Sequence, residues 1–568
     1  MKKLLALILV FTMCLSIVAC NNTDKPSDQG NQNEKPNDND NKPSGEPDAE
    51  QYYNTYLASD PTSLDISLRS DTYSSTIITN VMEGLIRRED RNGEYFMAPG
   101  DAQTWKSNEE GTVWTFYLGD NKWNDGEPVT AEQYVYSLRR SADPATGCPN
   151  SFFLSPILNY NAISKGEKDP SELGVKAIDE KTLEITLSQT VPAFLEMCNS
   201  TIYYPQREDK MQEWGEKYGT EAAYTMYNGP FVLDSWTHNS SLVLKKNPNY
   251  WNVDAVKLDK VNLAIMSDTT TIINAYKSGD LDTVGVSTQE WLEEFQKDSN
   301  SKYENYTTQS ILFTFYNTQN ELMKNEKIRK AFSLAIDHED INEMCFGGLR
   351  VPTWGWVVPT ISVGETNFRK AAGDVLLEQL EELTAKGQTP KDLLIEGMKE
   401  AGLGEDPSTL DITLSLAGTD DWFRTFGEYI QQVYLTELGV NLKINFAEWA
   451  IFYENVQNGN YQMAYMSWGA YYNDPYDVLS IFKSELDQVE TGWANAEFDR
   501  LIDEANVEMD EQKRLENYMA AEKILLEEAV ACPLLTSTVH SFYKNYVYGY
   551  SSLGFSTNGY KDMYTVGR

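Results

Sequence analysis

The sequence of 568 residues predicts an α/β protein. Segments whose apolar residues alternate, as in half-buried strands, are interleaved with segments whose apolar residues recur at helical spacing. No unit of about 20–50 residues repeats, which argues against a solenoid. No linker rich in Pro, Ser and Gly interrupts residues 50–568, so we expect a compact folded body over that range.

The amino-terminal stretch has the layout of a secretory signal. A basic "MKK" precedes residues 4–18, which are almost entirely apolar but fewer than the about 20 of a membrane-spanning helix. Residues 17–20 ("IVAC") resemble the lipobox of bacterial lipoproteins, in which the cysteine carries two acyl chains, enough for stable anchoring. We therefore predict a lipoprotein signal peptide at 1–19 and a lipidated Cys20. The alternative is an ordinary signal peptide with an incidental cysteine.

Residues 20–49 are expected to form a tether behind that anchor. Apart from Cys20 and Ala49, the stretch consists of polar residues, proline and glycine. Such a composition cannot bury enough apolar surface to offset the entropy lost on ordering. We predict a disordered segment that holds the folded body away from the membrane.

The chain is strongly acidic. Its formal charge is −39, and loss of Lys2 and Lys3 with the signal would remove two positive charges and leave −41. A charge of this sign and size is repelled by phosphate backbones, which excludes nucleic acid as a partner.

The first clear strand and helix are expected in succession. Residues 111–128 alternate and then reach a turn at 124–126, which predicts a strand followed by a tight turn. Residues 129–140 predict a helix with Thr130 as its N-cap. Gln133, three residues further on, would complete a capping box.

Later segments continue the mixture. Residues 181–194 alternate and predict a strand that Pro192 halts. Residues 325–344 carry apolar side chains at helical spacing. Residues 498–529 predict two amphipathic helices separated near 508–511.

Four cysteines remain in the predicted body, and they are far apart: Cys148, Cys198, Cys345 and Cys532. No CxxC pair and no Cys/His spacing typical of a metal site occurs, so no metal or other cofactor is expected. A Cys148–Cys198 disulfide and buried free thiols are both compatible with the sequence.

Catalytic motifs are missing from the sequence. His238, His338 and His540 are isolated from one another, which excludes a zinc hydrolase of the HExxH kind. No GxSxG elbow, phosphate loop or GxGxxG motif occurs. A carboxylate pair is not excluded by counting, but with 86 acidic residues a solvated surface is the better interpretation.

Aromatic residues are abundant. They make up 12% of the chain, with 34 tyrosines and 13 tryptophans. Most are expected in the core. Tyrosine also joins a rigid apolar face to a hydroxyl, which suits a pocket that binds hydrogen-bonding ligands without strong charge selectivity.

Several blocks along the whole predicted body resemble one family. The most specific is "WTFYLGDNKWNDGEPVTAEQYVYSLRRSADP" at 114–144. The blocks, in order, resemble the family-5 extracellular solute-binding proteins, the oligopeptide- and dipeptide-binding proteins of bacterial ABC importers. They are residues 60–90, 114–144, 172–194, 227–251, 274–282, 327–341, 438–452, 466–479 and 496–505.

The resemblance implies a class II periplasmic-binding-protein fold, in which two hinged lobes close on a ligand and a third domain is inserted. It also implies a monomer that is not an enzyme and that delivers solute to ABC permease and ATPase subunits. The location would be the extracellular face of the membrane, or the periplasm if the host has an outer membrane. The implied domains are lobe I at 50–83, 209–316 and 533–568, the inserted domain at 84–208 and lobe II at 317–532.

The resemblance also implies where a peptide ligand would lie. Members of the family pair the ligand backbone with protein main chain, as an added strand does. Ser467 and Gly469 fall on the strand that would offer those main-chain groups. Trp449 and Trp468 match two pocket tryptophans, although packing inside the lobe is the alternative for both.

One position departs from the family pattern. Where the family has an aspartate that pairs with the ligand's α-ammonium, this chain has Tyr471. Asp474 would restore the carboxylate through a shifted register, or it would be a turn residue before Pro475. Val456 and Tyr465 stand where the oligopeptide pattern has arginines.

Several functions therefore remain open. An oligopeptide receptor of an importer is the first. A receptor that senses a peptide pheromone or cell-wall peptide, and a receptor for a non-peptide solute, share the same fold. A hydrolase with a carboxylate pair is the least favoured, because no motif supports it.

Overall fold

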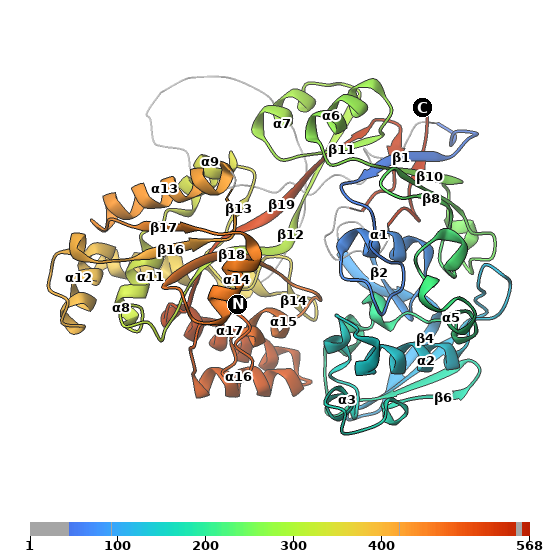
Figure 1. Cartoon of the computed structure of the whole chain (residues 1–568), viewed down its shortest axis with the longest axis horizontal. Coiled ribbons are helices and arrows are strands. Elements are labelled where there is room, and N and C mark those ends of the chain that lie inside the picture. The colour runs from blue at the N-terminus through green and yellow to red at the C-terminus, as the bar shows by residue number, and fades with distance from the viewer. Residues whose placement is uncertain (1–44, 92–93, 420, 552–558) are drawn as a thin grey trace, which may run out of the picture. The chain divides into compact units, whose positions relative to one another are not determined.

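The computed structural model describes residues 45–91, 94–419, 421–551 and 559–568. Residues 45–568 cluster into one compact unit (Figure 1). The expected signal peptide at 1–19, the lipidated Cys20 and the tether as far as residue 44 lie outside the described residues. No helix in the described part is both long and apolar enough to cross a bilayer.

A four-stranded sheet joins the start of the described chain to a segment about 200 residues further on. Its order is β1-β10-β9-β8, with β1 parallel to β10 and the other pairs antiparallel. Alternate side chains of β1, β9 and β10 are buried, as a one-sided sheet requires. The strands are β1 (Tyr52–Leu57), β8 (Phe231–Thr237), β9 (Ser241–Lys246) and β10 (Lys260–Ile265).

A second, wholly antiparallel sheet has the order β4-β5-β7-β6. The strand predicted in 111–128 is β5, and the one predicted in 181–194 is β7, which ends at Thr186, before Pro192. The predicted helix is α2 (Ala131–Ala142), where the Thr130 N–H donates to Gln133 Oε1 at 3.0 Å. The strands are β4 (Ala102–Ser107), β5 (Val113–Leu118), β6 (Val175–Asp179) and β7 (Thr182–Thr186).

A seven-stranded sheet is built around two long antiparallel strands, β12 and β19, which run side by side from α7 to β18 (Figure 1). Its order is β11-β19-β12-β18-β16-β17, and β13 also pairs with β19. The strands are β11 (Thr283–Val286), β12 (Ser301–Tyr316), β13 (Val351–Pro352), β16 (Thr413–Leu416), β17 (Lys443–Phe446), β18 (Met463–Gly469) and β19 (Ala531–Lys544).

Both segments of the later half that were predicted to be helical, 325–344 and 498–529, form helices. Residues 325–344 form two helices, because Asp337 accepts the N–H groups of Glu339 and Asp340 and starts a new one. Residues 498–529 form the two predicted helices. The helices are α8 (Glu326–Leu334), α9 (His338–Phe346), α11 (Val375–Ala385), α12 (Pro390–Glu400), α13 (Asp421–Glu437), α14 (Trp449–Gln457), α15 (Pro475–Leu479), α16 (Ala496–Val507) and α17 (Glu511–Glu527).

Shorter helices and two-stranded ribbons complete the described elements. The helices are α1 (Thr72–Val81), α3 (Tyr160–Ser164), α4 (Phe194–Met197), α5 (Glu208–Trp214), α6 (Thr269–Ser278), α7 (Gln289–Gln296) and α10 (Phe368–Ala372). The ribbons pair β2 (Ile86–Arg91) with β3 (Glu94–Pro99), β14 (Ser362–Val363) with β15 (Thr366–Asn367), and β20 (Val547–Tyr548) with β21 (Tyr564–Thr565).

The apolar core is divided into two large clusters and a small one. One large cluster lies within 311–535, and the other combines both four-stranded sheets, over 53–263, with Tyr472, Val547 and Met563. The small cluster packs α6 and α7 against β11 and β19. The four cysteines are free thiols. The implied domain boundaries themselves stay a prediction.

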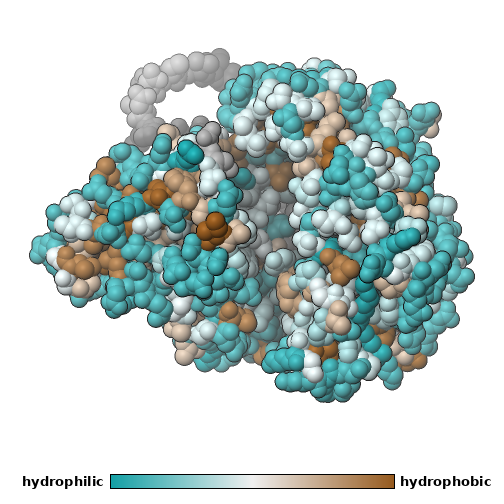
Figure 2. Space-filling model, viewed as in Figure 1, coloured by the Kyte–Doolittle hydropathy of each residue, from teal (hydrophilic) through white to brown (hydrophobic). Residues whose placement is uncertain are grey.

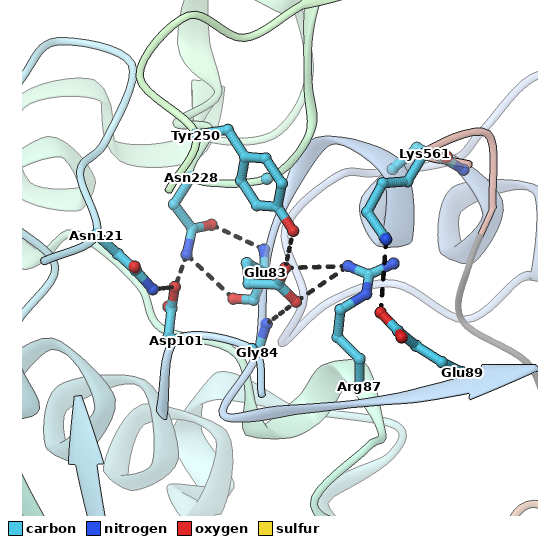
Figure 3. Close-up of polar contacts among 12 residues, drawn as sticks. Glu83, Gly84, Arg87, Glu89, Asp101, Asn121, Asn228, Tyr250 and Lys561 are labelled. Carbon is cyan, nitrogen blue, oxygen red and sulfur yellow. Dashed lines mark hydrogen bonds and ion pairs between the residues drawn. The ribbon is translucent and has the colours of Figure 1, made fainter. Parts of the chain in front are cut away.

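Hydrophilic residues cover most of the face shown in Figure 2, which is hollowed near its middle. The interior, in contrast, contains a buried ion pair (Figure 3). Arg87 Nη1 lies 3.0 Å from Glu83 Oε2, and both residues are at most 2% exposed. The Tyr250 hydroxyl donates to the same carboxylate at 2.7 Å. Asn228 completes the arrangement by bonding both the N–H and the carbonyl of Glu83.

A second buried carboxylate, Asp101, adjoins this ion pair (Figure 3). It accepts hydrogen bonds from Asn121 Nδ2, from the Tyr134 hydroxyl at 2.7 Å and from Asn228 Nδ2 at 2.9 Å. Burial, and then the nearby Glu83 carboxylate, raises the pKa of Asp101 well above its ordinary value. Asn228, in the segment before β8, thus bonds the backbone of Glu83 and the carboxylate of Asp101, which precedes β4.

Candidate binding site

A cavity with convergent polar groups has a volume of about 820 Å³, within the range of small-ligand sites. Its walls come from several separate stretches of the chain. They include the segment leading into α7, the end of α9 with the turn after it, the starts of α13 and α14, the middle of β18, and β19. The lining residues include Arg350, Trp422, Phe423, Trp449, Tyr465 and Ser467.

Strand β18 brings main-chain groups to this cavity. It pairs with β12 along its full length, from Met463 to Gly469. Its other neighbour, β16, is registered with it only from Met463 to Tyr465. Among the described residues, 466–469 therefore pair on one side only. The open side is the kind of strand edge to which an extended peptide can add.

Trp449 is placed as a ligand contact would be. It begins α14, is 54% exposed and lines the cavity. Its ring stacks on Tyr453 with centroids 5.5 Å apart and on Phe452 at 5.8 Å, which holds the indole in one orientation. A large aromatic side chain held rigid and half exposed offers binding area at low entropic cost.

Trp468 has a different environment. It is partly buried against the cluster in 311–535, and it is not among the residues that line the cavity. Its indole N–H is buried without a hydrogen-bond partner in the described part of the chain. Of the two predicted tryptophans, the structure therefore brings only Trp449 to the cavity.

Ser467 is exposed and lines the cavity, whereas Gly469 lies beyond it at the end of β18. Gly469 faces Ser310 of β12 in the strand register. Both residues belong to the segment whose second edge is open. Their predicted role as main-chain partners of a ligand stays a prediction.

Tyr471 makes aromatic contacts outside the cavity. Its ring meets Phe153 edge-on at 5.2 Å between centroids and Phe152 at 5.9 Å. Its N–H donates to Asp477 Oδ2 at 2.5 Å. Burial, the largest effect, and the nearby Asp474 raise the pKa of Asp477 to about 7, although hydrogen bonds from the Tyr471 and Tyr472 main chain oppose the rise.

Asp474 occupies a buried structural position. It is 2% exposed, accepts the Tyr476 N–H at 2.9 Å as the N-cap of α15, and forms an ion pair with the buried Arg514. The sequence left open whether Asp474 meets a ligand cation or lies in the turn before Pro475, and the structure places it in that turn. Both oxygens of the carboxylate are used by these two contacts.

Sequence reasoning missed several residues of the cavity wall. Trp422 and Phe423 come from α13, and Arg350 comes from the turn after α9. Tyr465 was noticed only as a departure from a family pattern. No local motif marks these positions, because they meet only when their elements pack. No group of three or more His, Cys, Asp or Glu side chains suited to a metal ion occurs in the described residues.

Comparison with known proteins identifies the relatives of this chain. The family model of bacterial extracellular solute-binding proteins, family 5, middle region, matches residues 97–489. The dipeptide-binding protein DppE of Bacillus subtilis is 33% identical over 482 residues, which cover 84% of each chain. The probable deoxycholate-binding periplasmic protein YgiS of Escherichia coli is 27% identical over 507 residues, 88% of this chain and 90% of that one.

A solved structure shares the fold. The substrate-binding domain of an oligopeptide ABC transporter from Bacillus anthracis superimposes with a TM-score of 0.72 at 30% identity, covering 91% of this chain and 99% of that chain. The predicted class II periplasmic-binding-protein architecture is therefore confirmed. The chain belongs to family 5 of the bacterial extracellular solute-binding proteins.

Proposed function

We propose that this protein is a lipid-anchored extracellular receptor that captures oligopeptides and delivers them to an ABC permease, without chemical turnover. The observation that carries the proposal is the open edge of β18 at 466–469 beside an aromatic cavity of about 820 Å³. Main-chain pairing supplies affinity that does not depend on ligand sequence, and a roomy cavity accepts varied side chains. The names of the relatives, which include dipeptide and oligopeptide binders, support the peptide class.

The test is a thermal shift of the full chain against peptide pools of two to eight residues, with free and N-acetylated pools in parallel. A ligand that binds only the folded state raises the melting temperature, by an amount that grows with the logarithm of its concentration relative to its dissociation constant. Stabilisation by either pool supports a peptide receptor. No shift with any peptide would overturn the peptide assignment and direct the search to non-peptide solutes.

The comparison of the two pools addresses Tyr471, which stands where the family pattern has a carboxylate. Stabilisation by free-amino peptides alone would mean that another carboxylate meets the ammonium. Asp477 would be the first to replace, because it already contacts the Tyr471 main chain. Equal stabilisation by acetylated peptides would mean that the amino end is not recognised.

The anchor is tested separately. We expect Cys20→Ala to abolish acylation and to leave the protein unprocessed or released from the membrane. Metabolic labelling with a fatty acid, followed by membrane fractionation, measures both. Continued labelling of the variant would overturn the proposed lipid site without affecting the peptide proposal.

A further inference from the structure

The charges around the cavity differ from those of the chain as a whole. The chain has 86 acidic residues and 47 Lys or Arg. Among the described residues that line the cavity, however, there is no aspartate or glutamate, and the one side chain with a permanent charge is Arg350. A guanidinium stays protonated at any physiological pH. The cavity therefore offers an anion one fixed cation and no carboxylate that would repel it.

The backbone of Arg350 is held firmly. Its N–H donates to Asn342 Oδ1 at 3.0 Å, and Asn342 Nδ2 donates to the Arg350 carbonyl at 3.0 Å. Asn342 is 5% exposed and belongs to α9. The following residues form β13, which pairs with β19. The side chain thus starts from a fixed point in the cavity wall.

The guanidinium itself has few partners. Arg350 Nη1 donates to the Thr538 carbonyl at 3.4 Å, and Cζ lies 5.4 Å from the centre of the Phe346 ring. No carboxylate in the described part of the chain lies within ion-pair distance. Burial lowers the pKa of Arg350, as expected for a cation that has lost much of its water. Several of its N–H donors remain for a ligand.

A second polar group without a partner lies in the same wall. Tyr465 is 4% exposed, and its hydroxyl has no hydrogen-bond partner among the described residues. Arg350 lines the same cavity as Tyr465. Burial raises the pKa of the Tyr465 hydroxyl, and the charge of Arg350 lowers it. A buried hydroxyl without a partner is costly, so its presence here indicates a group that a ligand supplies.

We propose that Arg350 and the Tyr465 hydroxyl bind a carboxylate of the ligand, and that the neighbouring aromatic residues bind an apolar group attached to it. Those aromatic residues are Trp422, Phe423 and Trp449. This inference rests on the proposed function in that it names the ligand chemistry of the same cavity. A charge-assisted pair with an arginine, in a site that excludes water, is stronger than a neutral hydrogen bond and favours planar carboxylates.

The carboxylate has three possible sources, and matched probes distinguish them. Tetrapeptides ending in Phe, as free acid and as amide, test the carboxyl terminus. An amidated peptide with an internal Glu-Phe pair, compared with Gln-Phe, tests a side chain. Deoxycholate tests a non-peptide acid with an apolar body. Isothermal titration calorimetry on the full chain in mild detergent measures each affinity.

We expect at least one acid to bind tenfold or more tightly than its neutral counterpart, or deoxycholate to bind measurably. Arg350→Gln should weaken that acid at least tenfold and leave the neutral counterpart within about threefold. Tyr465→Phe should weaken it by a smaller factor, and Arg350→Lys should retain part of the preference. Arg500→Gln is the matched control, because it removes the same charge from the exposed surface of α16.

The outcomes separate this inference from the proposed function. If peptides bind, but amidation, Glu→Gln exchange and Arg350→Gln each change the affinity less than threefold, the carboxylate site is wrong and the peptide receptor stands. If deoxycholate alone binds, and does so through Arg350, the peptide assignment is wrong and the carboxylate site stands. If no probe binds, both are wrong. Melting temperatures of the unliganded variants check folding, and Arg350→Lys serves if Arg350→Gln does not fold.

Discussion

The free energy of unfolding should depend strongly on single residues of the buried ion pair between Arg87 and Glu83. Replacing Arg87 by Met would leave the Glu83 carboxylate buried without its cation. We expect the free energy of unfolding to fall by about 3–5 kcal/mol, because an unpaired buried charge loses its hydration without compensation. Chemical denaturation measures the change.

Tyr250→Phe is the matched control for this prediction, since it removes one hydrogen bond to the same carboxylate and keeps the ring. Its expected loss is about 1.5–3 kcal/mol. An Arg87→Met variant that is no less stable than Tyr250→Phe would contradict the importance assigned to the ion pair.

Asp477 should make stability depend on pH. Its pKa is raised to about 7 in the folded protein, from an ordinary value near 3.8. Between about pH 4 and pH 7 the unfolded chain therefore releases a proton that the folded chain retains, so this group lowers stability as pH rises through that window. Above pH 7 the loss is complete.

We expect Asp477→Asn to remove this part of the decline, so that its melting temperature rises relative to the original between pH 4 and pH 7. An Asn Oδ1 can still accept the Tyr471 N–H. Parallel melting curves at several pH values, for both proteins, measure the difference. Identical pH profiles would show that Asp477 titrates normally.

At the scale of elements, the junction between α16 and α17 is encoded locally. Asp510 Oδ1 accepts the N–H groups of Gln512 and Lys513, both at 3.1 Å, and so begins α17. We expect Asp510→Ala to lower the free energy of unfolding by about 1 kcal/mol. Asp510→Asn, which keeps the acceptor, should cost much less in the same denaturation experiment. Equal losses would assign the effect to charge rather than to capping.

At the scale of the whole molecule, ligand binding should depend on Trp449 more than on Trp468. Trp449 is half exposed in the cavity, whereas Trp468 packs against a core cluster. We expect Trp449→Ala to weaken binding of a peptide by about 2 kcal/mol with little change in unliganded stability. Trp468→Ala should mainly lower stability, by less than the about 3–5 kcal/mol of a fully buried tryptophan.

Calorimetric titration and denaturation of both variants test this contrast. The opposite pattern, in which Trp468→Ala impairs binding and Trp449→Ala impairs folding, would place the ligand on the other face of β18.

The strands and helices were predictable where their signals are local. The alternation in β5, the capping box of α2 and the break between α16 and α17 each depend on residues within a few positions of one another. The helical spacing in 325–344 is confirmed, and the segment is divided between α8 and α9 because Asp337 caps a new helix.

The candidate site was predictable only in part. Ser467 and Trp449 line the cavity, and their role as ligand contacts stays a prediction. Trp468 does not line it, because it packs against the core cluster in 311–535. Asp474 was undecided from the sequence, and the buried Arg514, 40 residues away, determines its environment.

The sequence by itself therefore determined the elements whose signals are local and the acidity of the chain, because periodicity, capping and composition act over short distances. The resemblance of its sequence blocks indicated the family. Only the tertiary structure decided which side chains share the cavity. Arg350, Tyr465 and Trp422 are brought together by α9, β18 and α13, whose packing depends on burial of apolar faces rather than on spacing along the chain. Among the described residues, that packing also left the cavity lining without an aspartate or glutamate, which composition alone would not have suggested.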